Sequence, residues 1–423
     1  MGTKVTVVGG GSTYTPELID GFMRRRDRLA IDELVLLDID TERLEIVGGL
    51  AQRMLDLQDW TGRLVRTTDP HAAIDGADFV LIQLRVGGQA ARLVDETLPP
   101  GFGIIGQETT GAGGFAKALR TIPVVLELAE IVGRRAARDA WIVDFTNPVG
   151  VVTQALLDDG HRAVGLCNVA ITLQRRMARR FAVEPDRVQL EHVGLNHLSW
   201  ERAVRVDGVD RLPELLAGDL DELADELRLP AELIGWVGAI PSYYLRYYYL
   251  TQTVLAEQLA GHTRAQDVMD IEARLLELYR DPALAEKPSL LDDRGGAFYS
   301  EAAAQLIASL HDGRGDVQVV DVRNAGAIPD LPAGAVVEVP AVVDRTGAHP
   351  VATAPLAADQ RGLVQLVKAY EELTVAAARS GDRALALRAL TTHPLVGGEV
   401  AERVLDAILD ANRSHLPRFF ATT

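Results

Sequence analysis

The chain has 423 residues, a formal net charge of −17 at pH 7 and 48% hydrophobic residues. This length exceeds the roughly 250–300 residues over which one hydrophobic core usually extends, so we expect two closely packed domains. The acidic surface argues against nucleic acid and anionic lipid as partners, no apolar run approaches the ~18–20 residues that span a bilayer, and a single cysteine excludes an intrachain disulfide.

The first predicted elements are those of an α/β domain. Strand-like sequence starts at residue 4 and leaves no room for a secretory signal, so we expect a cytoplasmic protein. Helices are predicted at 41–57 and 115–136 and after Pro16, because proline is tolerated in a first helical turn. Apolar strands are predicted at 4–8, 34–38, 79–83, 141–145 and 162–166. This alternation indicates a parallel sheet covered on both faces, and we expect a Rossmann-like, doubly wound domain over residues 1–186.

The pattern changes near residue 187. Residues 188–206 are typical of antiparallel strands, and β-branched segments follow at 317–322 and 335–342. Helices are predicted at 213–228, 243–260, 266–280 and across 356–412. We therefore expect a second, α+β and largely helical domain over residues 187–423. No long linker is present, so the site should lie in the crevice between the two domains.

The glycine turn after the first strand resembles a dinucleotide-binding fingerprint. Gly9 and Gly11 match its first two glycines, although Tyr14 takes the third position. Asp38 ends the second strand and would bond a ribose hydroxyl and repel a 2′-phosphate, which favours NAD over NADP, while nearby Arg43 acts against that preference. The alternative is an ordinary strand-to-helix turn. The expected NAD-binding residues are Gly9, Gly10, Gly11, Ser12, Thr13, Asp38 and Arg43.

Three further residues suggest a catalytic centre. Cys167, in Gly-Leu-Cys-Asn, and His197, in Gly-Leu-Asn-His, could provide two ligands of a metal whose other positions stay open for substrate. Taken singly, each residue is better explained by a core role, the cysteine as a small hydrophobe and the histidine as a hydrogen-bonded residue. Asn147 follows a strand, where it could contact a nicotinamide ribose or a substrate hydroxyl, or cap the next helix.

A tyrosine-rich segment and a group of arginines complete the candidates. Helical spacing places Tyr244, Tyr247 and Tyr248 on one face, either as aromatic packing or with one phenol as a base whose pKa Arg246 lowers. A polar, glycine-rich loop spans residues 106–114. The arginines that could serve an anionic substrate beside it are Arg85, Arg92, Arg120 and the distant Arg264.

Taken together in this order, the motifs resemble those of glycoside hydrolase family 4, the NAD- and metal-dependent glycosidases, over essentially the whole chain. The motifs that carry the resemblance are Val-Gly-Gly-Gly-Ser-Thr-Tyr-Thr-Pro-Glu-Leu (8–18), Gly-Gln-Glu-Thr-Thr-Gly (106–111), Thr-Asn-Pro (146–148), Gly-Leu-Cys-Asn (165–168), Gly-Leu-Asn-His (194–197) and Tyr-Leu-Arg-Tyr-Tyr (244–248).

The resemblance implies a role for each candidate. Cys167 and His197 would bind a divalent metal, usually manganese, and Tyr244 would be the proton-abstracting base, with Tyr247 as second choice. Arg92 and Arg264 would hold a sugar phosphate, and Asn147 and Asn168 would contact hydroxyls. The implied catalytic residues are thus Tyr244 and Asn168, and the implied substrate-binding residues are Arg92, Glu108, Asn147, Asn168 and Arg264.

The family's chemistry would be hydrolysis without net redox change. NAD would take a hydride from C3 of the sugar, Tyr244 would remove the C2 proton, the aglycone would leave from C1, water would add, and NADH would return the hydride. The Cys167-Asn168 pair is typical of members that act on 6-phospho-β-glucosides. We therefore expect a phosphorylated disaccharide such as cellobiose 6-phosphate, or an aryl glycoside, as substrate, and a homodimer or homotetramer.

Three alternatives remain at this point. The chain could have another specificity of the family, as a 6-phospho-α-glucosidase or an α-galactosidase. It could be an NAD-dependent hydroxy-acid dehydrogenase, although Gly-Leu-Asn-His-Leu-Ser lacks the pattern around the catalytic histidine of those enzymes. It could also be a non-catalytic sensor of NAD and a sugar phosphate, which would need neither Cys167, His197 nor Tyr244.

Overall fold

The first half of the chain forms a parallel sheet with the strand order of a Rossmann fold. The computed structural model describes residues 2–218, 220–296 and 298–421. The order β3-β2-β1-β4-β5-β6 is that of the dinucleotide-binding fold, which confirms the expected architecture. The strands are β1 (Thr3–Val8), β2 (Ile31–Leu37), β3 (Arg63–Thr67), β4 (Phe79–Ile82), β5 (Trp141–Asp144) and β6 (Ala163–Gly165). The prediction missed β3, whose charged and half-buried residues do not form an apolar run.

The second half extends the same sheet with antiparallel strands. The strands are β7 (Val188–Leu195), β8 (Leu198–Val206), β9 (Val209–Asp210), β10 (Ile240–Pro241), β11 (Asp316–Arg323), β12 (Val336–Asp344) and β13 (Gly347–Pro350). β11 joins β6 of the first half through the single residue pair of Asp321 with Gly165. Within the second half, β12 joins β7 through the single residue pair of Glu338 with Gly194. The antiparallel strands expected over 188–206 are confirmed as β7 and β8, which form a hairpin. The sheet runs across residue 187 without a break, and the domain boundary placed there stays a prediction.

Helices cover the sheet from both halves of the chain. Those of the first half are α1 (Thr15–Met23), α2 (Thr41–Leu57), α3 (Pro70–Ile74), α4 (Gly88–Thr97), α5 (Gly111–Arg135), α6 (Val149–Asp158) and α7 (Val169–Arg180). Those of the second half are α8 (Leu212–Ala217), α9 (Asp221–Leu227), α10 (Ala231–Val237), α11 (Arg246–Tyr249), α12 (Thr251–Ala260), α13 (Arg264–Tyr279), α14 (Leu290–Asp293), α15 (Tyr299–Asp312), α16 (Ala358–Ser380), α17 (Arg383–Thr392) and α18 (Gly398–Ala411).

Two predicted helices are interrupted. The helix expected over 213–228 is two short helices, since the extended Gly218 ends α8. The helix expected over 243–260 starts as a 3₁₀ turn at Tyr243–Leu245 and breaks again at Leu250, whose φ of −123° and ψ of 36° are not helical. The tyrosine segment is therefore a tightly wound corner and not one face of a long helix.

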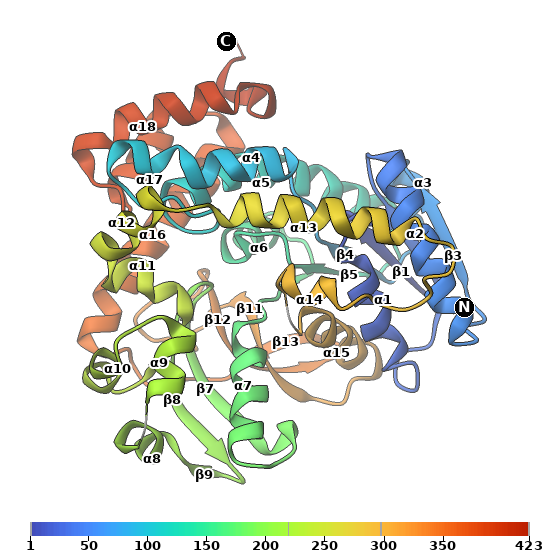
Figure 1. The fold of residues 1–423 in the computed structure, drawn as a ribbon, viewed down its shortest axis with the longest axis horizontal. Helices are drawn as coiled ribbons and strands as arrows, with labels where there is room; N and C mark the ends of the chain where they lie inside the picture. Colours follow the sequence, from blue (N-terminus) through green and yellow to red (C-terminus); the bar gives the residue numbers. More distant parts are fainter. Residues whose placement is uncertain (1, 219, 297, 422–423) are drawn as a thin grey trace.

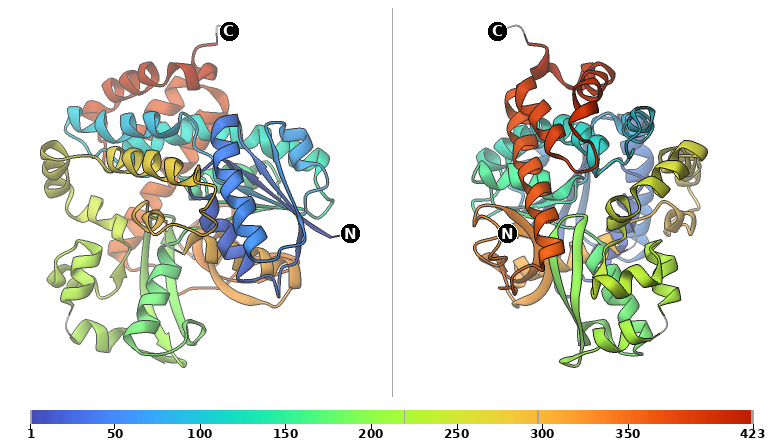
Figure 2. Two further views of the ribbon diagram at one scale, coloured as in Figure 1. Left: turned by 45° about the vertical axis from the view of Figure 1, so that its right-hand side comes forward. Right: turned by 90° about the vertical axis from the view of Figure 1, so that its left-hand side faces the viewer.

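Helices of the second half pack onto those of the first. In Figure 1 the long α13 crosses in front of the α/β half, while the β7–β8 hairpin extends away below with α8 and α9. Figure 2 shows the C-terminal helices on the other side, where α16 packs against α5 and α6. In turn α13 contacts α2 and α4. Within the described residues, no helix is both long and apolar enough to cross a membrane.

Arg120 makes a buried ion pair that fixes α5 against α4. Its guanidinium donates to both oxygens of Asp95 at 2.8 and 2.7 Å and to Asn412 Oδ1 at 2.9 Å, and its side chain is 1% exposed. Arg120 does not line the cavity described below, so the sequence-based suggestion that it serves an anionic substrate was wrong.

Replacing Arg120 by leucine should lower the free energy of unfolding by about 3–5 kcal/mol, because it leaves the buried Asp95 carboxyl without its partner. Urea denaturation followed by circular dichroism measures this loss. The double variant Arg120→Leu with Asp95→Asn should recover part of the lost stability, since neither charge of this ion pair remains. A loss under about 1 kcal/mol in the single variant would show that the pair is not needed for stability.

Candidate active site

A cavity of about 1710 Å³ lies where the ends of the parallel strands face α12 and α13. This volume exceeds the ~300–1000 Å³ of a typical single-ligand pocket and leaves room for two ligands. The predicted site residues that line it are Gly9, Gly11, Ser12, Asp38, Arg43, Arg92, Glu108, Asn147, Asn168, Tyr244 and Arg264. The remaining four, Gly10, Thr13, Cys167 and His197, are not part of its surface.

The glycine turn joins β1 to α1. Gly9 has a φ of 87°, and a Cβ added there would lie 3.0 Å from the carbonyl oxygen of Gln83. The Gly11 N–H donates to Asp38 Oδ2 at 2.8 Å, and a Cβ on Gly11 would meet that oxygen at 2.9 Å. Glycine is therefore needed at position 9, whereas a Cβ at position 11 would only have to displace the movable carboxylate of Asp38. The turn lies at the N-terminus of α1, a place where proteins bind phosphate groups.

Glu272 on α13 is a buried carboxylate beside this turn. It accepts from Arg294 Nη2 at 3.0 Å and from Gln89 Nε2 at 3.1 Å, and Arg43 Nη2 lies 3.4 Å away. Burial raises the pKa of Glu272, but Arg294 and Arg43 outweigh it and hold the pKa below its usual value. Arg294 also donates to Thr13 Oγ1 at 2.8 Å. Sequence reasoning missed Glu272 and Arg294, because no local motif links them to a turn more than two hundred residues earlier.

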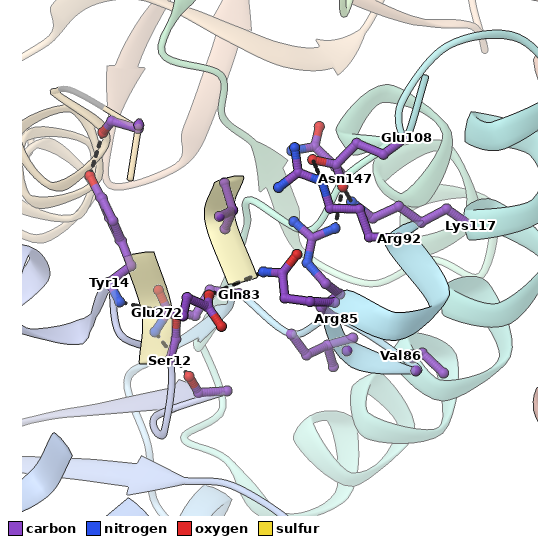
Figure 3. A pocket seen from close by; sticks show the side chains of 18 of the residues that line it. Ser12, Tyr14, Gln83, Arg85, Val86, Arg92, Glu108, Lys117, Asn147 and Glu272 are labelled. Carbon is purple, nitrogen blue, oxygen red and sulfur yellow. Dashed lines mark hydrogen bonds and ion pairs between the residues drawn. The ribbon is translucent and has the colours of Figure 1, made fainter. Parts of the chain in front are cut away.

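Glu108 gathers three cations on the cavity wall, as Figure 3 shows. It is ion-paired with Arg85, with Lys117 Nζ at 2.6 Å and with Arg92 Nε at 3.3 Å. Burial opposes ionisation of Glu108, but these cations hold its pKa well below the usual value. Burial and the charge of Arg85 lower the pKa of Lys117 to about 7. The group has more positive than negative charge, which suits an anionic ligand.

Lys117 was not identified from the sequence, although a signal was present. The chain has only four lysines against thirty-nine arginines. Lys117 is one of those four and lies in an otherwise apolar stretch of α5, where its side chain is 3% exposed. A charged residue in such a place requires a partner, so its position alone could have indicated a buried ion pair.

Arg92 and Arg264 lie on the same cavity wall. Arg92 Nε is 2.7 Å from Glu96 Oε1, and the other oxygen of Glu96 accepts from the Ala265 N–H at 2.8 Å. Glu96 thereby ties α4 to the first turn of α13, where Arg264 lies. The Arg264 guanidinium is 47% exposed and donates to the Asp293 carbonyl at 2.7 Å. Both predicted phosphate ligands line the cavity, and Glu96 connects the two helices that carry them.

His197 lies in the two-residue turn between β7 and β8. Its φ of 63° is in the left-handed region, and its ring stacks on Tyr244 with centroids 3.6 Å apart. Both ring nitrogens are buried and have no hydrogen-bond partner among the described residues. Burial lowers the pKa of His197 to about 4, so the imidazole is neutral, as a metal ligand must be.

Cys167 is buried beyond the cavity surface, with the Tyr299 hydroxyl 3.9 Å from its sulfur. Burial and the charge of Glu338 raise the pKa of this thiol, which a bound cation would reverse. No group of three or more His, Cys, Asp or Glu residues that could hold a metal occurs within the described ranges. A neutral, unpartnered imidazole and one thiol fit a metal bound by two protein ligands with positions left for substrate.

Tyr244 and Tyr247 both line the cavity, whereas Tyr248 does not. Tyr248 instead packs on His393 with centroids 6.2 Å apart. Burial and the charge of Cys167 raise the pKa of Tyr244. Asn147 Oδ1 is buried without a partner in the part of the chain that the structure describes, so it is available to a ligand.

Comparison with known proteins gives a consistent picture. Residues 4–183 match the model of the family 4 glycosyl hydrolases, and residues 192–396 match that of the family 4 glycosyl hydrolase C-terminal domain. A "Probable 6-phospho-beta-glucosidase" of Bacillus subtilis (strain 168) is 42% identical, with 99% of this chain and 98% of that protein covered.

Two solved structures are informative at different levels. The 6-phospho-beta glucosidase from Thermotoga maritima, determined with manganese, NAD⁺ and glucose-6-phosphate, is 35% identical with a TM-score of 0.91, and the match covers 98% of this chain and 99% of that one. Malate dehydrogenase from Plasmodium falciparum is 14% identical with a TM-score of 0.55, over 89% of this chain and 98% of that one. The second likeness concerns the fold alone.

The low pKa of Lys117 gives a pH-dependent anion site. Sulfate keeps a constant charge, so its affinity should fall as pH rises through about 7, where Lys117 loses its proton. Isothermal titration calorimetry between pH 6 and 9 measures the change. Lys117→Met should bind sulfate weakly at every pH, while the control Lys287→Met, which alters a distant partly exposed ion pair, should match the parent protein. A pH-independent affinity in the parent protein would contradict this assignment.

Proposed function

Because the chain belongs to family 4 of the glycosyl hydrolases, we propose that it hydrolyses 6-phospho-β-glucosides with NAD and a divalent metal ion, manganese being the first candidate. The observation that carries the proposal is the single cavity. It reaches from the glycine turn at Gly9 to Tyr244, which stacks on His197, and one of its walls carries the cationic group around Glu108. The Bacillus and Thermotoga proteins, both named for 6-phospho-β-glucosidase activity, support the substrate class.

Two groups would be held at the ends of this cavity. The glycine turn, with Asp38 and Arg43, would hold NAD, which supplies a hydride acceptor and donor for C3 of the sugar. Cys167 and His197 would hold the metal ion, which supplies Lewis-acid polarisation of the sugar oxygens at C2 and C3.

Side chains of the protein would bind the substrate and transfer the proton. Arg92, Arg264 and Lys117 would bind the 6-phosphate, and Asn147 with Asn168 would orient the sugar hydroxyls. A ketone at C3 makes the C2 proton acidic, and Tyr244 would remove it, after which the C1–O bond to the aglycone breaks. The raised pKa of Tyr244 means that this role requires a nearby cation, such as the bound metal ion, to favour the phenolate. Water then adds at C1, the proton returns to C2, and the C3 hydroxyl is restored, so the sum is hydrolysis.

A panel of p-nitrophenyl glycosides tests the specificity. With NAD and manganese present, release of nitrophenol should be fastest from the 6-phosphorylated β-glucoside, in line with the Cys167-Asn168 pair. Faster release from the α-glucoside or α-galactoside would establish another specificity of the family. Net NADH production from a hydroxy acid would indicate a dehydrogenase, and binding without turnover would indicate a sensor. We further propose a cytoplasmic homodimer or homotetramer, whose mass light scattering can measure.

The metal site is tested by Cys167→Ser. Because a serine hydroxyl stays protonated where a coordinating thiol becomes an anionic thiolate, this variant should lose manganese-dependent turnover while NAD still binds. Activity across a manganese titration and NAD calorimetry measure the two effects. Turnover at the parent protein's manganese affinity would exclude Cys167 as a ligand.

The phosphate site is tested by Arg92→Ala and Arg264→Ala. Replacement of the buried Arg92 should lower kcat/KM by the equivalent of about 2–4 kcal/mol, mainly by raising KM. Replacement of the half-exposed Arg264 should lower it by less. Arg274→Ala, on the exposed face of α13, is the matched control and should leave KM unchanged. The proposal fails if neither variant changes KM for the phosphorylated substrate.

The elimination route predicts exchange at C2. Turnover in deuterated water should place deuterium at C2 of the released sugar phosphate, which NMR detects, whereas direct displacement leaves C2 unlabelled. Tyr244→Phe should reduce the rate about 10²–10⁴-fold, the usual contribution of a general base. Tyr248→Phe, on the packed side of the same corner, is the control. Normal exchange in the Tyr244→Phe protein would move the base to Tyr247.

A further inference from the structure

A hydrogen-bonded group of three charged residues lies behind His197. His192 Nδ1 is 2.7 Å from Glu201 Oε1, and His192 Nε2 is 2.9 Å from Glu338 Oε2. All three side chains are at most 4% exposed, and none of them lines the cavity. Substrate therefore cannot reach them, and any part they play in catalysis must be exerted through a neighbour.

Glu338 connects this group to the turn that carries His197. Its second oxygen accepts from Asn196 Nδ2 at 3.1 Å, and Glu338 also pairs with Gly194 across the sheet. It thus holds the chain on the N-terminal side of His197 at two places. The backbone of His197 is left-handed, a conformation that residues other than glycine adopt at some cost in free energy. The turn therefore needs such anchoring.

The group also carries an uncompensated negative charge. Burial alone would lower the pKa of His192, but Glu201 and Glu338 outweigh burial and raise it to about 10, so the imidazole is protonated. One cation then faces two carboxylates. From the neighbouring strand, the Asp321 carboxyl adds no charge, because burial raises its pKa well above the usual value.

This charge lies beside the turn that carries His197, because Glu338 is bonded to Asn196 and paired with Gly194. A buried excess of negative charge is costly unless a cation lies close by. The turn beside this charge carries unpartnered ligand atoms, the two buried ring nitrogens of His197.

We propose that Glu338, held by His192 and Glu201, is a positioning residue for the divalent ion at Cys167 and His197. It anchors the Asn196–His197 turn and supplies the negative charge that favours a cation over a proton or an empty site. The inference rests on the metal site of the proposed function and extends it to residues that no motif contains. Hydrogen-bonding partners of this kind are worth about 10–100-fold in metal affinity.

The test is Mn²⁺ affinity, measured by electron paramagnetic resonance of the free ion in the presence of NAD. Glu338→Gln keeps the shape but removes the charge, and it should raise the Mn²⁺ Kd by about 10–100-fold while the NAD Kd stays unchanged. The matched control is Glu371→Gln, which neutralises another buried carboxylate, paired with Lys368 on α16, and should leave both constants unchanged. A merely structural role of Glu338 would alter stability without this selective loss.

A second variant tests the same inference if the Glu338→Gln protein does not fold. Asn196→Ala removes only the anchor of the turn, from a partly exposed position, and should also weaken Mn²⁺ binding. Cys167-dependent Mn²⁺ binding that neither variant changes would overturn this inference alone. Equal binding by the parent protein and Cys167→Ser would overturn the proposed metal site, and this inference with it.

Discussion

The site depends on two places where the sheet is joined by a single residue pair. Gly165 pairs with Asp321 two residues before Cys167, and Gly194 pairs with Glu338 three residues before His197. A Cβ on Gly165 would lie 2.3 Å from Thr153 Oγ1, and one on Gly194 would lie 2.2 Å from the Leu198 carbonyl oxygen. Close packing therefore leaves no room for a side chain at the first residue of either Gly-Leu motif, because side chains of α6 pack onto Gly165 and the backbone of β8 packs onto Gly194. The two glycines lie just before Cys167 and His197, a thiol and an imidazole that come from opposite halves of the sheet.

Electrostatics divides the cavity into two regions of different character. On a chain with a net charge of −17, Lys117 and its neighbouring arginines form a local excess of positive charge around Glu108. At the end where we propose the metal ion, Glu338 supplies charge of the opposite sign. An anion is favoured at one end and a cation at the other, so a phosphorylated sugar that bridges them has only one favourable orientation.

The residues in local motifs could be predicted from the sequence, and those that act over long range could not. The glycine turn and five of the six parallel strands are encoded in short local patterns, and the doubly wound sheet that they form matched expectation. Glu272 and Glu338 lie near the site but belong to segments far along the chain. The sequence around each of them is that of an ordinary helix or strand, so no local motif marks them. The break at Leu250 was missed because apolar periodicity continues through it, although tertiary packing winds the tyrosine corner more tightly.

The sheet's continuity also has a consequence for how the protein is made. During synthesis β6 emerges early, but its neighbour β11 is translated only after everything from α7 to α15. Until then the free edge of β6 offers unpaired backbone groups to any other nascent chain, which is the usual origin of misassembly in large α/β proteins. The order of translation therefore delays completion of the sheet, and the edge beside the thiol stays unpaired until β11, which ends at residue 323, has left the ribosome.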